Sequence, residues 1–500
     1  MSDKEINKGL DHDEPLLFDI GDVNKSGVDL HKSENTENFL GKSYEDREIG
    51  LPGLSEPETV RHYVRLSRKN YSIDAGLYPL GSCTMKHNPR LNEKLARIKG
   101  FSEVHPLQPI YTCQGALELI YEISNWLKEL TGMSAVTMTP KAGAQGELCG
   151  MLAIKKALLS KNEFHRNKVL VPDSAHGTNP ATAAFLGFEV VTIKSHKDGR
   201  LNFNDFKENV DENFAAAMIT NPNTCGLFEN DIIEIAEYIH DSGGYLYCDG
   251  ANFNALVGKV KPGDLGIDAM HINLHKTFST PHGGGGPGSG PVVFSKILAD
   301  FCPSPIVEKE NDKFVLYEDE KEEKLNHSFG RLCAFHGQMG MFVRALSYMM
   351  SHGADGLRQV SEDAVLNANY IKASLENVLT PAYSGFCMHE VLFNDDFLEG
   401  SGVETIDFAK ALIDEGYHPM TIYFPLVVHG ALLVEPTETE SKQSIDQFIE
   451  TIKNLANKVS EGEEFFKKAP KHTPIRRLDE TKAARNPVLR WKKEDVIAAE

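Results

Sequence analysis

Short apolar runs alternate with helical stretches between about residues 130 and 300, and this alternation constrains the fold more than any other feature. A strand, a connecting helix and the next strand pack as parallel neighbours, with helices covering both faces of the sheet. We therefore expect an α/β domain with a mainly parallel sheet. The runs expected to form buried strands are Val169–Val171, Val190–Ile193, Ala216–Ile219, Tyr245–Cys248 and Val292–Phe294.

Other local signals lie on both sides of this region. Ser55 and the acidic residues that follow it are typical of a helix start. Apolar residues recur every three or four positions over Ala116–Leu130, and Gly132 follows as a helix-ending residue, so we expect an amphipathic helix there. The charged run Glu308–Lys324, with its apolar centre Phe314–Tyr317, indicates an exposed hairpin.

Changes in composition divide the chain into successive segments. Polar residues with weak periodicity indicate an N-terminal arm, helical patterns follow it, and the last residues are basic. The expected segments are an arm at 1–55, a helical segment at 56–130, a large α/β domain at 131–340, a small α+β domain at 341–465 and a basic tail at 466–500.

The charge balance and the cysteines argue against several classes of protein. The 52 Lys and Arg against 72 Asp and Glu give a net charge of −20, whereas a nucleic-acid-binding protein needs a basic surface for the phosphates. No apolar run approaches the roughly 18–20 residues that cross a bilayer, and the N-terminus lacks the layout of a signal peptide. The 8 cysteines form no Cys-x-x-Cys pair, which favours reduced thiols over a metal site. We therefore expect a cytoplasmic protein that binds neither membranes nor nucleic acid.

Lys276 lies at the end of an apolar segment, just before the glycine-rich stretch Gly283–Pro291. This stretch indicates a loop whose backbone can approach another group closely. It lacks the residue order of a P-loop, and the strand Val292–Phe294 follows it where a dinucleotide-binding turn requires a helix. Most lysines are surface residues, but a deprotonated lysine beside a buried sheet can form a Schiff base. Lys276 is therefore the candidate reactive residue.

Two further stretches supply groups that a pyridoxal phosphate site requires. Asp249 stands at the end of an expected strand, where an acid can pair with a protonated pyridine nitrogen. Ala142–Glu147 opens an expected helix. Backbone amides at such a helix start, at Ala144 and Gln145, can bind a phosphate at the positive end of the helix dipole.

His176 and Asn223 each follow another expected strand. An imidazole at position 176 can stack on a cofactor ring, and the stretch around Asn223 offers amides for a phenolic oxygen. Each fragment also has an ordinary interpretation, because Asp249 can be a helix cap, His176 a loop histidine and the helix start a simple turn. Ligands bind at the carboxyl ends of the strands in an open α/β sheet, so the fragments together predict one cofactor site.

The order of these groups along the chain resembles that of fold type I pyridoxal-phosphate enzymes, the aspartate aminotransferase superfamily. Three longer stretches, Tyr78–Pro89, Asn273–Phe278 and Gly430–Glu440, are similar to the glycine dehydrogenase (decarboxylating) family, the P-proteins of the glycine cleavage system. The tail around Arg476–Trp491 also resembles this family.

This resemblance implies a fold type I large domain followed by a smaller α+β C-terminal domain. Many P-proteins are single chains about twice this size, built from two homologous halves, and this sequence resembles the lysine-bearing C-terminal half. The resemblance therefore implies a partner, subunit 1, in a heterotetramer with two copies of each chain.

The resemblance also implies the chemistry. Pyridoxal 5'-phosphate would be held by Lys276, glycine would lose its carboxylate as CO2, and the aminomethyl group would pass to the lipoyl arm of H-protein. Asp249 would keep the ring protonated, and His275 and Thr277 would reach the phosphate. His282 is a candidate proton donor or a loop-packing residue. Arg344 and Arg331 are cationic candidates for the glycine carboxylate.

Alternative functions stay open from the sequence. Another fold type I enzyme, such as an amino-acid decarboxylase or a cysteine desulfurase, would share Lys276, Asp249 and His176 but would not predict the stretches at 78–89 and 430–440. A non-catalytic scaffold subunit has no need of the lysine or the aspartate. The basic tail Lys467–Lys493 is a candidate docking site for H-protein, which tends to be acidic in this family.

Overall fold

The computed structural model describes residues 14–28, 31, 50–282, 288–319, 321–473 and 475–490. It has two compact units, one within residues 1–75 and 469–500, and the other spanning Gly76–Lys468. Most of the glycine-rich loop expected after His282, and much of the expected arm at 1–55, lie outside the described residues. The first unit contains α1 (Leu17–Ile20), α2 (Glu56–Ser67) and α15 (Glu480–Arg485).

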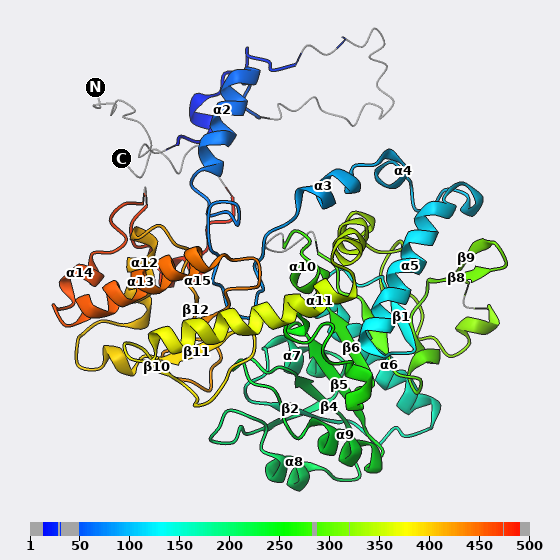
Figure 1. Ribbon diagram of the computed structural model, residues 1–500. Coiled ribbons are helices and arrows are strands. Elements are labelled where there is room, and N and C mark those ends of the chain that lie inside the picture. Colours follow the sequence, from blue (N-terminus) through cyan, green and yellow to red (C-terminus); the bar gives the residue numbers. More distant parts are fainter. Residues whose placement is uncertain are drawn as a thin grey trace. The chain divides into compact units, whose positions relative to one another are not determined.

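A seven-stranded sheet forms the centre of the second unit (Figure 1), in the order β1-β7-β6-β5-β4-β2-β3. The pairs from β3 through β2, β4 and β5 to β6 are parallel, whereas β7 runs antiparallel to both of its neighbours. The strands are β1 (Ala135–Thr137), β2 (Lys168–Pro172), β3 (Glu189–Ile193), β4 (Phe214–Thr220), β5 (Tyr245–Gly250), β6 (Ala269–Ile272) and β7 (Val292–Phe294).

The mainly parallel sheet expected from the sequence is thus confirmed, and each expected run forms a strand. The sequence missed β1 and β6, because β1 has only three residues and β6 carries a histidine, His271, within a short apolar run. The strand at Val292–Phe294 runs antiparallel to β6, and the short helix α10 (Leu274–Thr277) lies in the connection between them.

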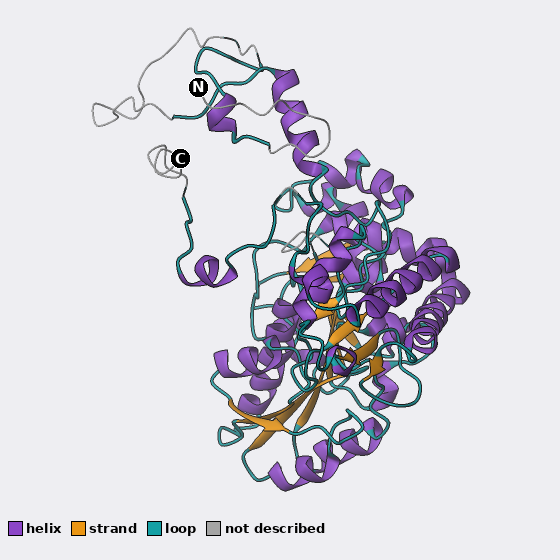
Figure 2. Cartoon of the chain, turned by 90° about the vertical axis from the view of Figure 1, so that its left-hand side faces the viewer, coloured by secondary structure: helices purple, strands orange, loops and turns teal. Residues whose placement is uncertain are grey.

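Alternate residues along the strands enter two separate cores, so both faces of the sheet are buried. Leu170 and Ala217 pack with residues of α5 (Gln114–Thr131), α9 (Ile232–Asp241) and α11 (Met339–Leu375). Val169 and Ala216 pack on the opposite face with α6 (Gly143–Ser160) and α7 (Thr178–Phe185). Figure 2 shows helices on both sides of the strands. α8 (Phe203–Asn209) contacts the edge strand β3.

The local signals outside the sheet are largely confirmed. α5 ends at Gly132, which has the left-handed φ of 69° that glycine tolerates. The Glu58 side chain caps the amide of Ser55 at the start of α2. The strands β8 (Ile306–Glu310) and β9 (Lys313–Tyr317) form the expected hairpin. The expectation that its centre is exposed is wrong, because Phe314 and Leu316 are buried against α5.

A second, antiparallel sheet has the order β10-β11-β13-β12. The long helix α11 contacts α5 and α3 on one side and β11 and α13 on the other, so it joins the two sheets (Figure 1). α11 is interrupted at Gly353, where φ is 61°. The remaining elements are α3 (Arg90–Ala96), α4 (Lys99–Ser102), β10 (Thr380–Pro381), β11 (Val391–Asn394), α12 (Thr405–Asp414), β12 (Thr421–Ile422), β13 (Leu432–Val434), α13 (Lys442–Val459) and α14 (Glu464–Lys467).

None of the described helices has the length and apolar character that a bilayer-spanning segment requires.

Candidate active site

Lys276 lies at the carboxyl end of β6, in the short helix α10. Parallel strands end at one edge of a sheet, and polar loops gather there. The Lys276 side chain is largely buried, with 9% of the residue exposed. Its Nζ donates a hydrogen bond of 2.7 Å to the carbonyl oxygen of Ser82. The reactive amine is therefore held by a segment almost 200 residues away in the chain, not by its own loop.

Asp249 lies near the end of β5, in register with His271 of β6. Its carboxylate accepts hydrogen bonds from Asn179 Nδ2 at 3.0 Å and from the amide of Ala251 at 2.9 Å. His271 Nε2 lies 3.4 Å from it. Burial opposes ionisation, but His271, these hydrogen bonds and Lys276 outweigh it and lower the pKa of Asp249. The structure therefore holds an anion at this strand end.

A cavity of about 380 Å³ collects most of the predicted residues. Ala144, His176, Asp249, His275 and Lys276 all line it, as the sequence predicts for a single site. Its size is that of a small-molecule site. Volume alone does not select it, because cavities of about 690 Å³ and 630 Å³ also occur, but neither is lined by these residues.

Three predicted residues do not line this cavity. Gln145 accepts a hydrogen bond from the amide of Lys141. Asn223 donates to the carbonyl of Gly199 and to the carboxyl of Glu229, and thus braces its own loop. Thr277 is fully buried, and within the part of the chain that the structure describes its hydroxyl has no hydrogen-bond partner. The proposed cofactor contacts of these three residues remain predictions.

The two arginines considered for a substrate carboxylate are engaged elsewhere. Arg344 makes a two-pronged contact with Glu93, at 2.7 Å and 2.9 Å. Arg331 pairs with Glu318 at 2.7 Å. Neither arginine lines the cavity.

The N-terminus of α6 opens onto the cavity, with Gly143 and Ala144 in its lining. The chain is so close-packed here that a Cβ on Gly143 would lie 2.9 Å from the amide atoms of Asn273, and one on Gly146 would lie 2.7 Å from His271 Cβ. Glycine therefore lets the start of this 18-residue helix approach the ends of the strands. Such a helix start suits the phosphate of pyridoxal phosphate.

His176 follows β2 and lines the same cavity. Its Nδ1 lies 2.9 Å from Thr178 Oγ1, and its ring meets Phe424 edge to face, with centroids 5.8 Å apart. Burial lowers the pKa of His176, although Asp249 acts to raise it, so the ring is neutral at pH 7. The neutral His176 ring lines the same cavity as the Asp249 carboxylate, and its exposed ring fits the face of a pyridine ring.

Glu147 is a residue of this cavity that the sequence did not single out. It lies one turn into α6, where a lone acid is indistinguishable from a surface residue. Burial, and then the negative charge of Asp249, raise its pKa to about 8. Thr178 Oγ1 donates to its Oε1 at 2.6 Å. Glu147 is therefore largely protonated at pH 7, and of these two acids Asp249 carries the negative charge.

Replacing Glu147 with glutamine is expected to change the pH dependence of stability. The unfolded carboxyl ionises near its ordinary pKa of 4.5, whereas the folded one does so near 8, so the folded state binds more protons between these values. Glu147 thus makes the free energy of unfolding fall as pH rises through this range, by up to about 1.4 kcal/mol per pH unit. Denaturant unfolding of the cofactor-free protein, repeated at several pH values, measures this dependence. The free energy of unfolding should fall less steeply with pH in Glu147→Gln than in the wild type. An unchanged slope would contradict the assignment, and the exposed Glu129→Gln variant is the control.

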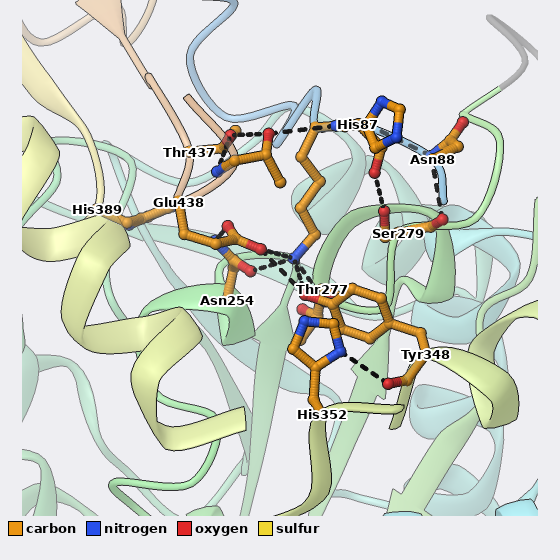
Figure 3. A network of polar contacts seen from close by, with 12 residues as sticks. His87, Asn88, Asn254, Thr277, Ser279, Tyr348, His352, His389, Thr437 and Glu438 are labelled. Atoms are coloured by element: carbon orange, nitrogen blue, oxygen red, sulfur yellow. Dashed lines mark hydrogen bonds and ion pairs between the residues drawn. The ribbon is translucent and has the colours of Figure 1, made fainter. Parts of the chain in front are cut away.

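The three stretches that carry the family resemblance meet around the lysine. Lys86 Nζ donates to Asn254 Oδ1 at 2.8 Å, to the carbonyl of Thr277 at 2.8 Å and to Glu438 Oε1 at 2.7 Å. Tyr348 also donates to Glu438, at 3.0 Å. Figure 3 shows these partners gathered around one buried amine. Residues from 78–89 and 430–440 therefore fix the backbone directly beside Lys276.

Further hydrogen bonds join the same stretches (Figure 3). Asn88 Nδ2 donates to the carbonyl of Ser279 at 3.0 Å, and the Ser279 hydroxyl donates to the carbonyl of His87. The amide of His87 donates to Thr439 Oγ1 at 3.2 Å. Leu80 forms a bridge to Val434 of β13. No local sequence pattern could have predicted these pairings.

Comparisons with known proteins agree with this arrangement. The family model "Glycine dehydrogenase, C-terminal domain" matches residues 360–475, and "Aminotransferase class-V" matches residues 152–285. A probable glycine dehydrogenase (decarboxylating) subunit 2 of Caulobacter vibrioides is 63% identical, over 97% of this chain and 93% of its own length. The Kosmotoga olearia protein of the same name is 53% identical, over 95% of this chain and 99% of its own length.

Solved structures match the fold at low sequence identity. A glycine decarboxylase (P-protein) of the glycine cleavage system, in inhibitor-bound form, has a TM-score of 0.71 and 22% identity, covering 83% of this chain and 93% of that chain. Glutamate decarboxylase of Lactobacillus brevis has a TM-score of 0.64 and 12% identity, covering 84% and 97%. With the class-V aminotransferase match, these likenesses confirm the expected fold type I architecture.

Proposed function

The chain belongs to the glycine dehydrogenase (decarboxylating) subunit 2 family, and from this we propose that it decarboxylates glycine with pyridoxal 5'-phosphate and passes the aminomethyl group to the lipoyl arm of an H-protein. The observation that supports it best is the single cavity that holds Lys276 and Asp249 beneath the start of α6. These groups fit the amine, ring-nitrogen and phosphate contacts of the cofactor.

Each residue has a distinct task in this proposal. Bound pyridoxal phosphate supplies an electron sink for the electron pair left on the glycine α-carbon when CO2 departs. Lys276 Nζ holds the cofactor covalently, and the Asp249 carboxylate keeps a proton on the ring nitrogen. His271 and Asn179 fix the Asp249 carboxylate. The amides at the start of α6 bind the phosphate, to which we also assign His275 and Thr277.

Two adjacent histidines, His275 and His282, line the cavity. Burial lowers the pKa of His275 to about 3 and that of His282 to about 4, so both rings are neutral at pH 7. The ring centroids lie 4.8 Å apart, edge to face, and the buried His282 Nε2 has no hydrogen-bond partner among the described residues. We assign His282 as the contact for the glycine carboxylate. A neutral partner holds a carboxylate less tightly than an arginine does, which favours its loss as CO2.

The proposal extends to partners and location. The name of the related subunits implies a subunit 1, and we propose a heterotetramer with two copies of each chain. The basic tail Lys467–Lys493 is our candidate docking site for lipoylated H-protein, with the last part of it outside the described residues. Because its 8 cysteines are free in the structure, we propose that the protein works in the cytoplasm.

The decisive experiment is glycine-dependent exchange of labelled bicarbonate with lipoylated H-protein, with and without subunit 1. We expect exchange that needs glycine, cofactor, H-protein and subunit 1 together. Exchange at the same rate without H-protein would show that decarboxylation does not depend on a lipoyl arm. Release of sulfur from cysteine would indicate a desulfurase, and full activity without subunit 1 would disprove the two-subunit proposal.

A further inference from the structure

Three fully buried side chains, His389, Glu390 and Glu435, form a cluster next to the lysine. Glu390 immediately precedes β11 and Glu435 immediately follows β13, and the two strands are paired neighbours. One ring nitrogen of His389 and one carboxyl oxygen of each glutamate lie within 4.8 Å of one another. Two carboxyl groups this close, without water around them, cannot both carry a charge at low cost.

Both carboxyl groups hold the turn that holds Lys276. The amide of Ser82 donates to Glu390 Oε2 at 2.6 Å, and the amide of Thr84 donates to Glu435 Oε2 at 2.9 Å. Ser82 and Thr84 have φ angles of 59° and 45°, a left-handed conformation that non-glycine residues rarely adopt without support. The Ser82 carbonyl then accepts the hydrogen bond from Lys276 Nζ. The cluster therefore acts on the lysine through a single strained turn.

Charges around the cluster favour one proton on the carboxyl pair. Burial, and then Glu435, raise the pKa of Glu390 well above its ordinary value, and burial raises that of Glu435 to about 7. Lys276 acts in the opposite direction on both carboxyls.

Among the described residues, the other titratable groups that face the pair are His389, Cys83, Cys225, Cys387, Lys86 and Glu438. Burial raises the pKa of the three thiols, so they are neutral at pH 7. Burial and Lys276 lower the pKa of His389 to about 3, so this ring adds no positive charge at pH 7. The Lys86 ammonium is paired with Glu438. The ammonium of Lys276 is therefore left to face the carboxyl pair.

We propose that Glu390 and Glu435 are positioning residues that share one proton, and that their single remaining negative charge, with the Ser82–Thr84 turn, holds the Lys276 amine in place and matches its charge. The positioning role rests on the proposed function only where it concerns the bound cofactor. The shared proton is a property of the chain itself, and it is measurable without cofactor.

The first measurement is infrared spectroscopy of cofactor-free protein at neutral pH. Subtracting the spectrum of Glu435→Gln from that of the wild type should leave the C=O band of a protonated carboxylic acid. Removing one acid relieves the other of its like-charged neighbour. We expect the hydrogen bond from the turn and the charge of Lys276 then to outweigh burial, so that the remaining carboxyl ionises. Glu390→Gln should give the same difference band. Absence of the band in both differences would overturn the shared proton.

The second measurement is the pH titration of the visible absorption of pyridoxal phosphate added to the protein. Each single variant keeps one negative charge, so its midpoint should stay close to that of the wild type. The double variant Glu390→Gln/Glu435→Gln keeps amide partners for the turn but no charge. Its midpoint should fall by about one pH unit, since an anion no longer stabilises the protonated form. An unchanged midpoint in the double variant would show that the two carboxyl groups have only a structural role.

Asp268→Asn is the matched control, because Asp268 is an equally buried carboxyl at the opposite end of β6, where it accepts a hydrogen bond from the amide of Leu246. It should leave the midpoint unchanged. Stoichiometric divalent metal in the wild type that the double variant lacks would overturn the proposal in favour of a metal site. If cofactor produces no visible band at all, the proposed function fails, while the infrared difference still decides whether the proton is shared.

Discussion

Replacing Lys276 with alanine is expected to abolish the visible absorption of bound pyridoxal phosphate and to lower glycine-dependent bicarbonate exchange by a factor on the order of 10³ or more. The substitution removes the amine that donates to the Ser82 carbonyl. Cofactor that still binds would do so through noncovalent contacts, such as those proposed for Asp249, His176 and the start of α6. Absorbance spectra and exchange rates of the purified variant, with subunit 1 and H-protein present, measure both effects.

Lys372 provides the matched control for this substitution. It has the same 9% exposure as Lys276, but its Nζ donates to the carbonyls of Tyr383 and Gly385 in the smaller sheet region. Lys372→Ala should therefore keep the visible absorption, even if it unfolds at a lower temperature. Equal loss of absorption in both variants would point to general unfolding, and a persisting band in Lys276→Ala would refute the assignment of the reactive lysine.

Replacing Glu438 with glutamine is expected to destabilise the protein by about 3–5 kcal/mol, because it leaves the ammonium of Lys86 buried without a counter-charge. The pair is 2.7 Å apart, and the two side chains are 1% and 8% exposed. Burial lowers the pKa of Lys86, while Glu438 acts to restore it. Denaturant unfolding, read as the midpoint at constant slope, measures the loss.

Two comparisons decide whether the missing counter-charge is the cause. The double variant Lys86→Met/Glu438→Gln removes both charges and should recover part of the stability lost in Glu438→Gln. The exposed pair Lys442–Asp446 has the same 2.7 Å separation, and Asp446→Asn should have little measurable effect. A double variant as unstable as the sum of the two single variants would exclude coupling between Lys86 and Glu438.

The sequence allowed the sheet and much of the site to be predicted because both follow from local patterns. Apolar runs between helices predict parallel strands, and the strand-end rule then brings Asp249, His176 and Lys276 to one edge. The cofactor contact expected of Asn223 stays a prediction. In the structure its side-chain oxygen closes its own turn, accepting hydrogen bonds from the backbone amides of Cys225 and Leu227.

Residues that act through distant partners could not be predicted in this way. In the sequence, Glu147, Glu390 and Glu435 look like ordinary surface acids. Only their burial beside other charged groups raises their pKa values. Lys86 likewise has no local pattern that indicates a buried ion pair with Glu438. The stretches at 78–89 and 430–440 could be associated with a family, but their contact with each other and with Thr277 required the tertiary structure.

The hydrogen bonds that hold the reactive lysine determine when its site can form during synthesis of the chain. The amide of Thr84 and the carboxyl of Glu435 are 351 positions apart in the chain. All strands of the large sheet, and Glu390, leave the ribosome before β13 has been made, so the Ser82–Thr84 turn lacks its Glu435 partner until then. A nascent chain halted before Gly430 would contain Lys276, Asp249, Glu390 and the whole start of α6. It would still lack Glu435 and Glu438, whose carboxyls hold Thr84 and Lys86.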